Sequence, residues 1–394
     1  MNKTAFLAAL ILAGCGGGED SATSGLPRGV TADGIRIGAH SDLSGVVATW
    51  GVSSTNGARM RFEEANAVGG IHGRKIEYIV EDTQYQVPNA VKATNKLLNI
   101  DEIFLMVAAL GTPLNNAVMP RMFEAGVPNL FPLTGAVSMY EPLHPMKFSY
   151  FVSYRDQIRG GVRYLAENND VRNVCLQAVA TDYGQEVEIG FEQAVEEHDL
   201  NVAYLGRHKG SETDFSGTAT AIKNAGCDLL VLGPFIKDAI LIYTAVRDAG
   251  FTAPVVGNMV PYVPEVAPAG NGSMDGFYAV ASFRMLDFET EKDADTWAGE
   301  WYRRYVEIFG EPPAPNSQIG YVMGDLTVRA LEAAGPDVTV EKVLAAIESI
   351  DYYEDPFGGP SLSFSPTKHQ GGDSLNLYQV QDRKWVTVAE GLPY

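Results

Sequence analysis

The sequence is poor in basic residues. It carries 29 Lys and Arg residues against 49 Asp and Glu residues in 394 positions, so its formal net charge at pH 7 is −20. Nucleic-acid binding needs clustered Lys and Arg to neutralise phosphates, so this balance argues against a nucleic-acid partner. The chain still has 46% hydrophobic residues, enough to bury a full core. We expect an acidic, well-solvated protein outside the cytoplasm.

The motifs of common enzymes are also missing. The six histidines show no paired metal-ligand spacing. There is no Gly-x-Ser-x-Gly nucleophile motif and no phosphate-binding loop, and the glycines of 270–276 have the wrong spacing for a dinucleotide fingerprint. Asp42, Asp82 and Asp182 are candidates for acid–base chemistry, but each ends a strand-like run, where capping or hydrogen bonding explains it better. We therefore expect no catalytic residue, no metal and no cofactor.

Cysteine is scarce, with only three residues in the chain. Cys175 and Cys227 lie in apolar, strand-like runs and lack metal-site spacing. An oxidising compartment would allow a disulfide between them. Because disulfide geometry is restrictive, two free buried thiols are an equal alternative at this point.

Long apolar runs are absent beyond the N-terminus. There, Lys3 precedes a run from Ala5 to Ala13 that is too short to span a bilayer. Residues 1–15 indicate an export signal, and their Leu-Ala-Gly-Cys ending at Cys15 resembles the lipobox of bacterial lipoproteins. Cys15 would then carry a lipid anchor to a membrane, followed by a flexible tether over 16–30. The alternative is an ordinary signal peptide with a chance cysteine.

Short apolar runs alternate with longer amphipathic stretches along the rest of the chain. Strand-like runs at 34–39, 75–82 and 104–109 are each followed by a helix-like stretch, and the pattern repeats from 173 onward. Such alternation is typical of βαβ units with parallel strands. We therefore predict an α/β fold of two doubly wound lobes.

Several motifs occur in an order that resembles a known family. The most specific is the stretch 65–76, Ala-Asn-Ala-Val-Gly-Gly-Ile-His-Gly-Arg-Lys-Ile. The others are Ser41–Gly45 with Trp50-Gly51, Asn56–Arg59, Glu81–Gln84, Ala125–Pro128, Arg155–Gln157, Asp182–Gly184 and Thr213–Ser216. From Gly34 onward the chain resembles the type I periplasmic solute-binding proteins, specifically the leucine/isoleucine/valine-binding protein family of ABC importers.

The resemblance implies two Rossmann-like lobes joined by a three-strand hinge, with a ligand held between them. We place lobe one at 31–152 plus 284–350 and lobe two at 153–283 plus 351–394. The disulfide usual in this family near 81–84 has no counterpart, since no cysteine stands at 83–85 or 110–111. Packing alone must hold those loops.

Ligands of open α/β sheets bind beyond the carboxyl ends of the strands. In lobe one, Gly111-Thr112-Pro113 follows a strand, and a Thr at the N-cap with Pro after it suits a helix start. A helix N-terminus favours a carboxylate, to which Thr112 and Thr134 add hydroxyl donors. By resemblance, these positions and the adjoining Gly135 grip the ligand carboxylate; the alternative is that Thr112 only caps its helix.

The resemblance also assigns ring side chains to the ligand cleft. Trp50, in a Gly-flanked loop, matches an indole that borders the ligand, although it could instead be a packing residue of the lobe surface. Tyr183 and Phe235 match rings that close over the ligand from lobe two. Both follow strand-like runs closely, as cleft residues must.

The chain departs from the family pattern at Met259. Amino-acid-binding members place an acid here to pair with the ligand ammonium, and burying an ammonium without a partner costs several kcal/mol. Methionine instead makes an adaptable apolar wall. We therefore expect a small apolar or aromatic ligand with a carboxylate. The alternatives are a branched-chain amino acid, an amide or a neutral hydrophobic compound.

The resemblance supplies the remaining expectations. The chain should be a periplasmic monomer that captures a small molecule by hinge closure and docks on the permease of an ABC importer in the inner membrane. A ligand-sensing receptor subunit is the alternative, because the same fold serves sensors.

Overall fold

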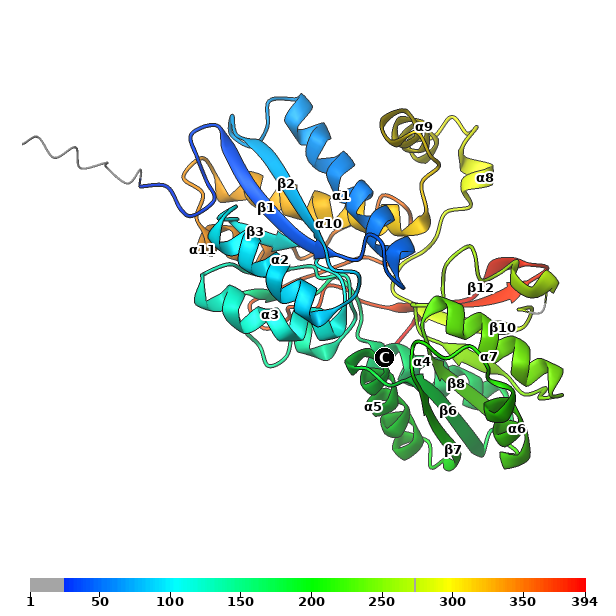
Figure 1. The fold of residues 1–394 in the computed structure, drawn as a ribbon. Coiled ribbons are helices and arrows are strands. Elements are labelled where there is room, and N and C mark those ends of the chain that lie inside the picture. Colours follow the sequence, from blue (N-terminus) through cyan, green and yellow to red (C-terminus); the bar gives the residue numbers. More distant parts are fainter. Residues whose placement is uncertain (1–24, 273) are drawn as a thin grey trace, which may run out of the picture.

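The computed structural model describes residues 25–272 and 274–394. The predicted export signal over 1–15 and the lipidation of Cys15 lie outside the described residues, as does most of the tether. Within these two ranges, no helix has the length and apolar character that a membrane span requires. The described chain forms two α/β halves side by side (Figure 1), as predicted from the alternation of strand-like and helix-like segments.

Lobe one is built on a parallel sheet with the strand order β2-β1-β3-β4-β5. Its strands are β1 (Gly34–Ser41), β2 (Lys75–Asp82), β3 (Leu105–Val107), β4 (Asn129–Leu130) and β5 (Lys147–Phe148). The helices of this lobe are α1 (Ala48–Ala67), α2 (Val87–Asn99), α3 (Thr112–Glu124), α8 (Phe288–Glu291), α9 (Trp297–Phe309), α10 (Pro315–Ala334) and α11 (Val340–Glu348), with a 3-10 turn η1 (Val137–Met139).

Lobe two repeats the same strand pattern and adds a hairpin. Its sheet order is β12-β11-β10-β9-β8-β6-β7, in which β6 to β10 are parallel and β11 and β12 are antiparallel. The strands are β6 (Asn173–Val179), β7 (Asn201–His208), β8 (Leu229–Gly233), β9 (Val255–Gly257), β10 (Phe277–Ala281), β11 (Leu375–Gln381) and β12 (Lys384–Leu392). The helices are α4 (Tyr154–Asn168), α5 (Asp182–Glu197), α6 (Ser216–Ala225) and α7 (Ile236–Asp248), with a 3-10 turn η2 (Ala269–Gly272).

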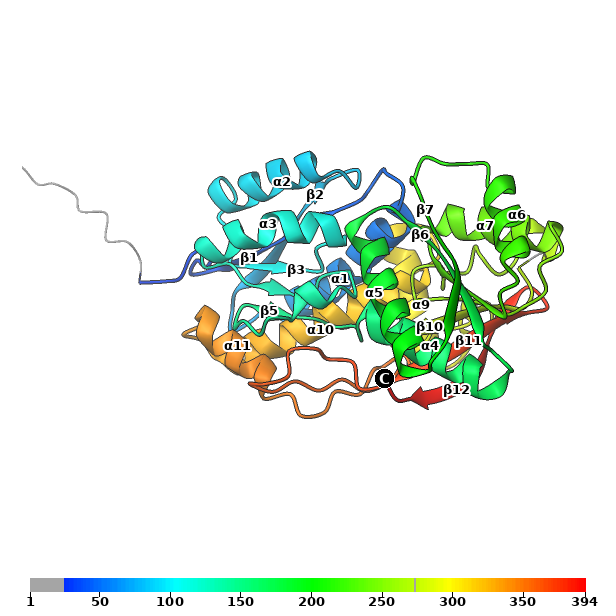
Figure 2. The same cartoon turned by 90° about the horizontal axis from the view of Figure 1, so that it is seen from below.

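Glycines bring α1 and α10 into close contact on one face of the first sheet (Figure 2). A Cβ on Gly57 would lie 1.9 Å from the carbonyl oxygen of Ser317, and one on Gly320 would lie 1.9 Å from that of Ser54. Any larger residue would push the helices apart. This close approach explains why α1 has glycine at position 57 despite its cost in a helix interior.

The chain crosses between the lobes three times. It passes from β5 to α4, returns from β10 to α8, and passes again from α11 to β11. The first two crossings are joined by a hydrogen bond from the Val152 N–H to Ser282 Oγ, at 3.2 Å. The second and third are joined where the Tyr378 hydroxyl donates to the Phe283 carbonyl at 2.9 Å. The crossings therefore form one buried hinge.

The third crossing differs from the expected boundary at residue 351. The Tyr353 hydroxyl donates to Asp325 on α10 at 3.0 Å, and the Phe364 ring packs on Phe131 and Phe148 of lobe one. The segment from 351 to 372 thus lies against lobe one, and the chain enters the second sheet only at β11. The segment stays on the first lobe because its side chains Tyr353 and Phe364 are buried there.

The structure resolves the open question about the two body cysteines. Cys175 on β6 and Cys227, just before β8, form a disulfide with a Cα–Cα distance of 5.8 Å. The two strands are parallel neighbours, which brings these residues together near the N-terminal ends of both strands.

Candidate ligand-binding site

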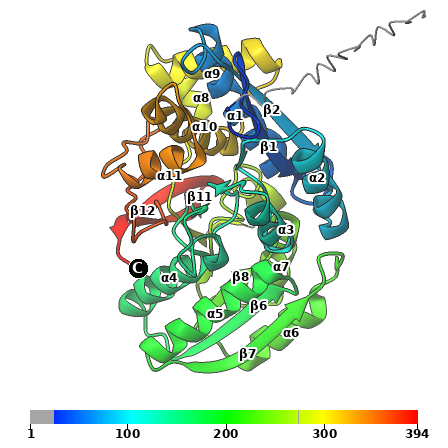
Figure 3. The same cartoon turned by 90° about the vertical axis from the view of Figure 1, so that its left-hand side faces the viewer.

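A cavity lies between the lobes at the carboxyl ends of the parallel strands. Figure 3 shows the two lobes meeting at this junction, where α3 of lobe one contacts α5 of lobe two. The space open to the centre of a water molecule inside it is about 40 Å³. Lobe one lines it with Val47, Trp50, Tyr85, Leu110, Gly111, Thr112 and Leu133. The chain beyond the first crossing lines it with Tyr154, Tyr183, Phe235, Met259 and Val260.

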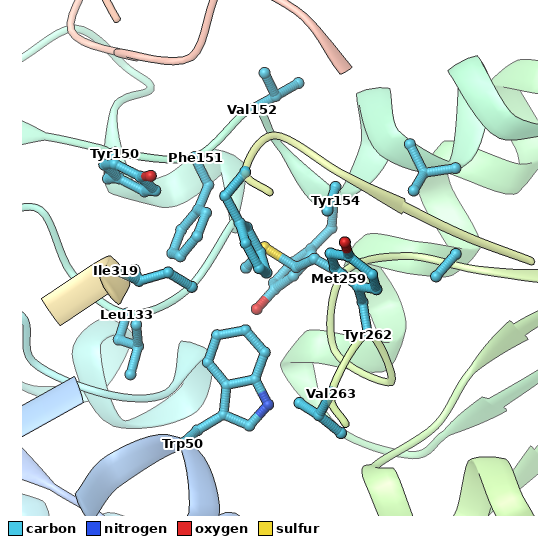
Figure 4. Packing of buried hydrophobic residues seen from close by; sticks show 14 of the residues in the cluster. Trp50, Leu133, Tyr150, Phe151, Val152, Tyr154, Met259, Tyr262, Val263 and Ile319 are labelled. Atoms are coloured by element: carbon cyan, nitrogen blue, oxygen red, sulfur yellow. The ribbon is translucent and has the colours of Figure 1, made fainter. Parts of the chain in front are cut away.

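Trp50 lies in this cavity, although not in a loop as its glycine neighbour suggested. Helix α1 begins at Ala48, so Trp50 occupies the first helical turn. Its indole N–H donates to the Val260 carbonyl at 3.3 Å, across the lobes, and its ring meets Phe283 of the hinge edge-on at 6.2 Å. Figure 4 shows Trp50, Tyr154 and Met259 converging from three segments. Trp50 thus contacts the cavity, the opposite lobe and the hinge together.

The start of α3 differs from the predicted cap. The N-cap is Gly111, whose φ of +100° favours glycine, and Thr112 is the first helical residue. Thr112 makes no cap hydrogen bond; its hydroxyl instead pairs with that of Thr134 at 2.7 Å. The interpretation of Thr112 as the helix cap was therefore wrong, because the preceding glycine takes that position.

The other predicted lobe-one residues stand behind the cavity surface. Pro113, Thr134 and Gly135 are not among the lining residues. Gly135 accepts the Tyr154 N–H at 2.7 Å, and a Cβ there would lie 3.1 Å from the Tyr154 ring. Burial raises the pKa of Tyr154 to about 12. The hydrogen bonds of Tyr154 with Thr134 and Gly135 act in the opposite direction and lower this pKa. These residues support the cavity wall rather than form it.

On the lobe-two side, three predicted residues line the cavity. The Tyr183 hydroxyl donates to Asn258 Oδ1 at 3.0 Å, and the Tyr183 ring stacks on Phe235 at 6.1 Å between centroids. Met259 is buried, with 1% of its surface exposed, and its N–H donates to Gln157 Oε1 at 2.9 Å. These bonds hold the three side chains against the cavity without involving a charged group.

Sequence reasoning missed two ring residues, Tyr85 and Tyr154. Tyr85 follows β2, and its ring meets that of Phe235 edge-on at 5.5 Å; Tyr154 opens α4, and its ring meets that of Tyr183 at 4.9 Å. Tyr85 stands three residues beyond the end of β2, which was an available signal, whereas Tyr154 begins α4 after the first crossing between the lobes. The Tyr85 ring also packs on Gly111, so the two loops expected to lack a disulfide are held by this contact.

The electrostatics of the cavity come from the backbone. Its lining residues include no Asp, Glu, Lys, Arg or His. Helices α1, α3, α4, α5 and α7 all begin at it, and each N-terminus carries a partial positive charge. Asp42 accepts the N–H groups of Gly45 and Val47 at α1, and α4, α5 and α7 each have an acid in the first turn. Only α3 among the five has neither a side-chain acceptor at its cap nor an acid in its own first turn.

Comparison with known proteins is consistent with this geometry. A family model described as periplasmic binding protein matches residues 34–384. The chain belongs to this family. As a periplasmic binding protein it has the two-lobed type I fold, and its relatives are solute-binding proteins that work with ABC transporters in the periplasm.

Individual relatives are distant and carry different ligands in their names. The Leu/Ile/Val-binding protein homolog 3 of Brucella melitensis is 25% identical over 368 residues, covering 93% of this chain and 96% of that protein. A fatty acid ABC transporter substrate-binding protein from Thermomonospora curvata superposes with a TM-score of 0.81 at 22% identity, covering 93% of this chain and 97% of its own. A solute-binding protein from R. palustris in complex with benzoate gives 0.78 at 16% identity, with coverages of 91% and 97%.

Proposed function

We propose that this periplasmic binding protein is the lipid-anchored substrate-binding component of an ABC importer and captures a small apolar or aromatic carboxylate between its lobes. Trp50, Tyr183, Phe235 and Met259 would enclose the apolar body, and the start of α3 at Gly111 and Thr112 would receive the carboxylate. Pro113, Thr134 and Gly135 would position that helix start, and Cys15 would carry the lipid.

The observation that carries the proposal is the N-terminus of α3. It has no side-chain cap and no acid in its first turn, and the cavity that it faces is lined by no Asp, Glu, Lys, Arg or His. Free backbone N–H groups and the helix dipole favour an anion at this end. Each of the other four helix starts already has a carboxylate of the protein near its N–H groups. A single ligand carboxylate, placed at α3, would therefore complete the set.

The same cavity disfavours an α-amino acid. An ammonium would meet Met259 and aromatic rings, with no carboxylate among the lining residues. Asp182, at the start of α5 beside Tyr183, is already bonded to Asn116 of lobe one at 2.9 Å. Leaving an ammonium unpaired in such surroundings costs several kcal/mol.

Two matched ligand pairs test the proposal. Hexanoate and norleucine differ only by the ammonium group, and benzoate and benzamide differ by the charge of the carboxylate. We expect hexanoate and benzoate to raise the melting temperature of the purified protein in proportion to the logarithm of their concentration. Norleucine should bind at least about a hundredfold more weakly than hexanoate. Equal or tighter binding of norleucine or leucine would overturn the exclusion of α-amino acids, and equal binding of benzamide and benzoate would overturn the carboxylate assignment.

A further inference from the structure

The loop between β2 and α2 holds Tyr85 in an unusual backbone conformation. Gln84 and Tyr85 have φ values of +52° and +54°, in the left-handed region that residues other than Gly and Asn rarely adopt. The N–H of Tyr85 donates to the Thr83 hydroxyl at 3.3 Å, and Thr83 in turn donates to the Ser41 carbonyl at 2.9 Å. Such strain persists where surrounding contacts fix it, and it is concentrated at functional sites.

This conformation aims the Tyr85 ring at the start of α3. A Cβ on Gly111 would lie 2.8 Å from Tyr85 Cε2, so the ring rests on the bare Cα of that glycine. On its other side the ring meets Phe235, at the start of α7 in lobe two, at 5.5 Å and 83°. The ring therefore fills the space between the starts of α3 and α7.

We propose that Tyr85 is a specificity-determining residue that excludes aliphatic carboxylates with an alkyl branch on the tetrahedral carbon next to the carboxylate. This inference rests on the proposed function, because it takes the carboxylate to sit at the start of α3. With the ring beside Gly111, a branch on the first carbon beyond the carboxylate would meet the Tyr85 ring. The rest of the cavity, bordered by Trp50 and Met259, receives the unbranched body.

The experiment compares hexanoate with 2-ethylhexanoate, which have the same main chain and differ by one branch. Binding is measured by calorimetry on the wild type, Y85G and Y85F. Glycine is the chosen truncation because it removes the ring and also relieves the positive φ. Phenylalanine keeps the ring and is the matched control. We expect the wild type and Y85F to prefer hexanoate, and Y85G to lower that preference by about tenfold, the value of two buried methylene groups.

The outcomes separate the two proposals. If the wild type binds hexanoate and Y85G keeps the same preference, or loses both ligands equally, Tyr85 has only a structural role and this inference is overturned. If the wild type binds benzoate but neither aliphatic acid, this inference is overturned and the proposed function stands. If it binds none of the three acids, the proposed function fails and takes this inference with it. Should Y85G not fold, Y85N decides in its place, since Asn also tolerates the left-handed region.

Discussion

Glu186 of α5 joins the two lobes: its Oε2 accepts the backbone N–H of Val137, on the η1 turn of lobe one, at 3.1 Å. The same carboxylate accepts two hydrogen bonds from Arg155, at 2.9 and 2.7 Å, within lobe two. The lobe contact is thus made by a carboxylate whose position is already fixed. Contacts made only when the lobes meet are what favours closure around a ligand.

The first prediction concerns this contact. In E186Q the amide nitrogen that replaces one carboxylate oxygen cannot accept from Arg155, so one of the two Arg155 bonds that fix this side chain is lost, and its bond to Val137 across the lobes is weakened. We expect hexanoate affinity to fall by about five- to tenfold, which corresponds to one net hydrogen bond. Calorimetry measures the affinity, and small-angle scattering measures the fraction of closed molecules.

The matched control is E188Q on the same helix. Glu188 pairs with Arg207 of β7, inside lobe two, and among the described residues it makes no hydrogen bond or ion pair with lobe one. Its substitution should leave ligand affinity unchanged. Equal losses in E186Q and E188Q would mean that Glu186 acts on lobe stability and not on closure.

The second prediction concerns the ring side chains of the cavity. Trp50 and Phe235 are 5% and 7% exposed and come from opposite lobes. Replacing either by Ala should weaken hexanoate or benzoate binding by more than about 1 kcal/mol, since buried aromatic anchors carry most of a binding energy. I100A is the control, because Ile100 is 72% exposed at the end of α2. Unchanged affinity in both ring variants would remove the site assignment.

The third prediction concerns the disulfide. Cys175 and Cys227 are separated by 52 positions. A crosslink of this span reduces the conformational entropy of the unfolded chain and so raises the free energy of unfolding by about 3–5 kcal/mol. The C175A/C227A double variant should lose about that much stability in urea denaturation. Its ligand affinity should stay unchanged, because both cysteines lie at the strand ends opposite the cavity. A large loss of affinity with little loss of stability would contradict this separation.

The fourth prediction concerns pH. His40 of β1 is fully buried, and neither ring nitrogen has a hydrogen-bond partner within the described chain. Burial lowers its pKa from 6.5 to about 4. The unfolded chain therefore binds a proton before the folded one does, and stability falls by about 3 kcal/mol as the pH drops from 6.5 to 4.

The H40L variant isolates this effect. Urea denaturation across that pH range should show a smaller loss of stability for H40L than for the wild type. Asp355 acts with the opposite sign, since burial raises its pKa to about 6 and its stability penalty grows as the pH rises toward 6. Because Asp355 is present in both proteins, the difference between them reports on His40. Parallel pH profiles would contradict the assignment.

Part of the site was predictable because parallel strands bring their carboxyl ends to one edge. Residues just past those ends, such as Trp50, Thr112, Tyr183 and Phe235, could be named from motif order, and the structure brings all four to one cavity. The cap at Gly111 could not be read in this way, since a positive φ depends on where the loop must turn. Tyr85 was missed because its side-chain direction follows from the backbone conformation of its loop.

The sequence by itself determined the α/β class and the two-lobed family, because the alternation of apolar runs and ordered motifs depends on local periodicity and turn chemistry. It also determined that position 259, where amino-acid-binding members of the family place an acid, is occupied by methionine. Tertiary structure alone decided that Cys175 and Cys227 pair, that 351–372 packs on lobe one, and that rings from both lobes meet over the start of α3. These are contacts between segments distant along the chain, whose geometry depends on how the two sheets are placed and not on any local pattern.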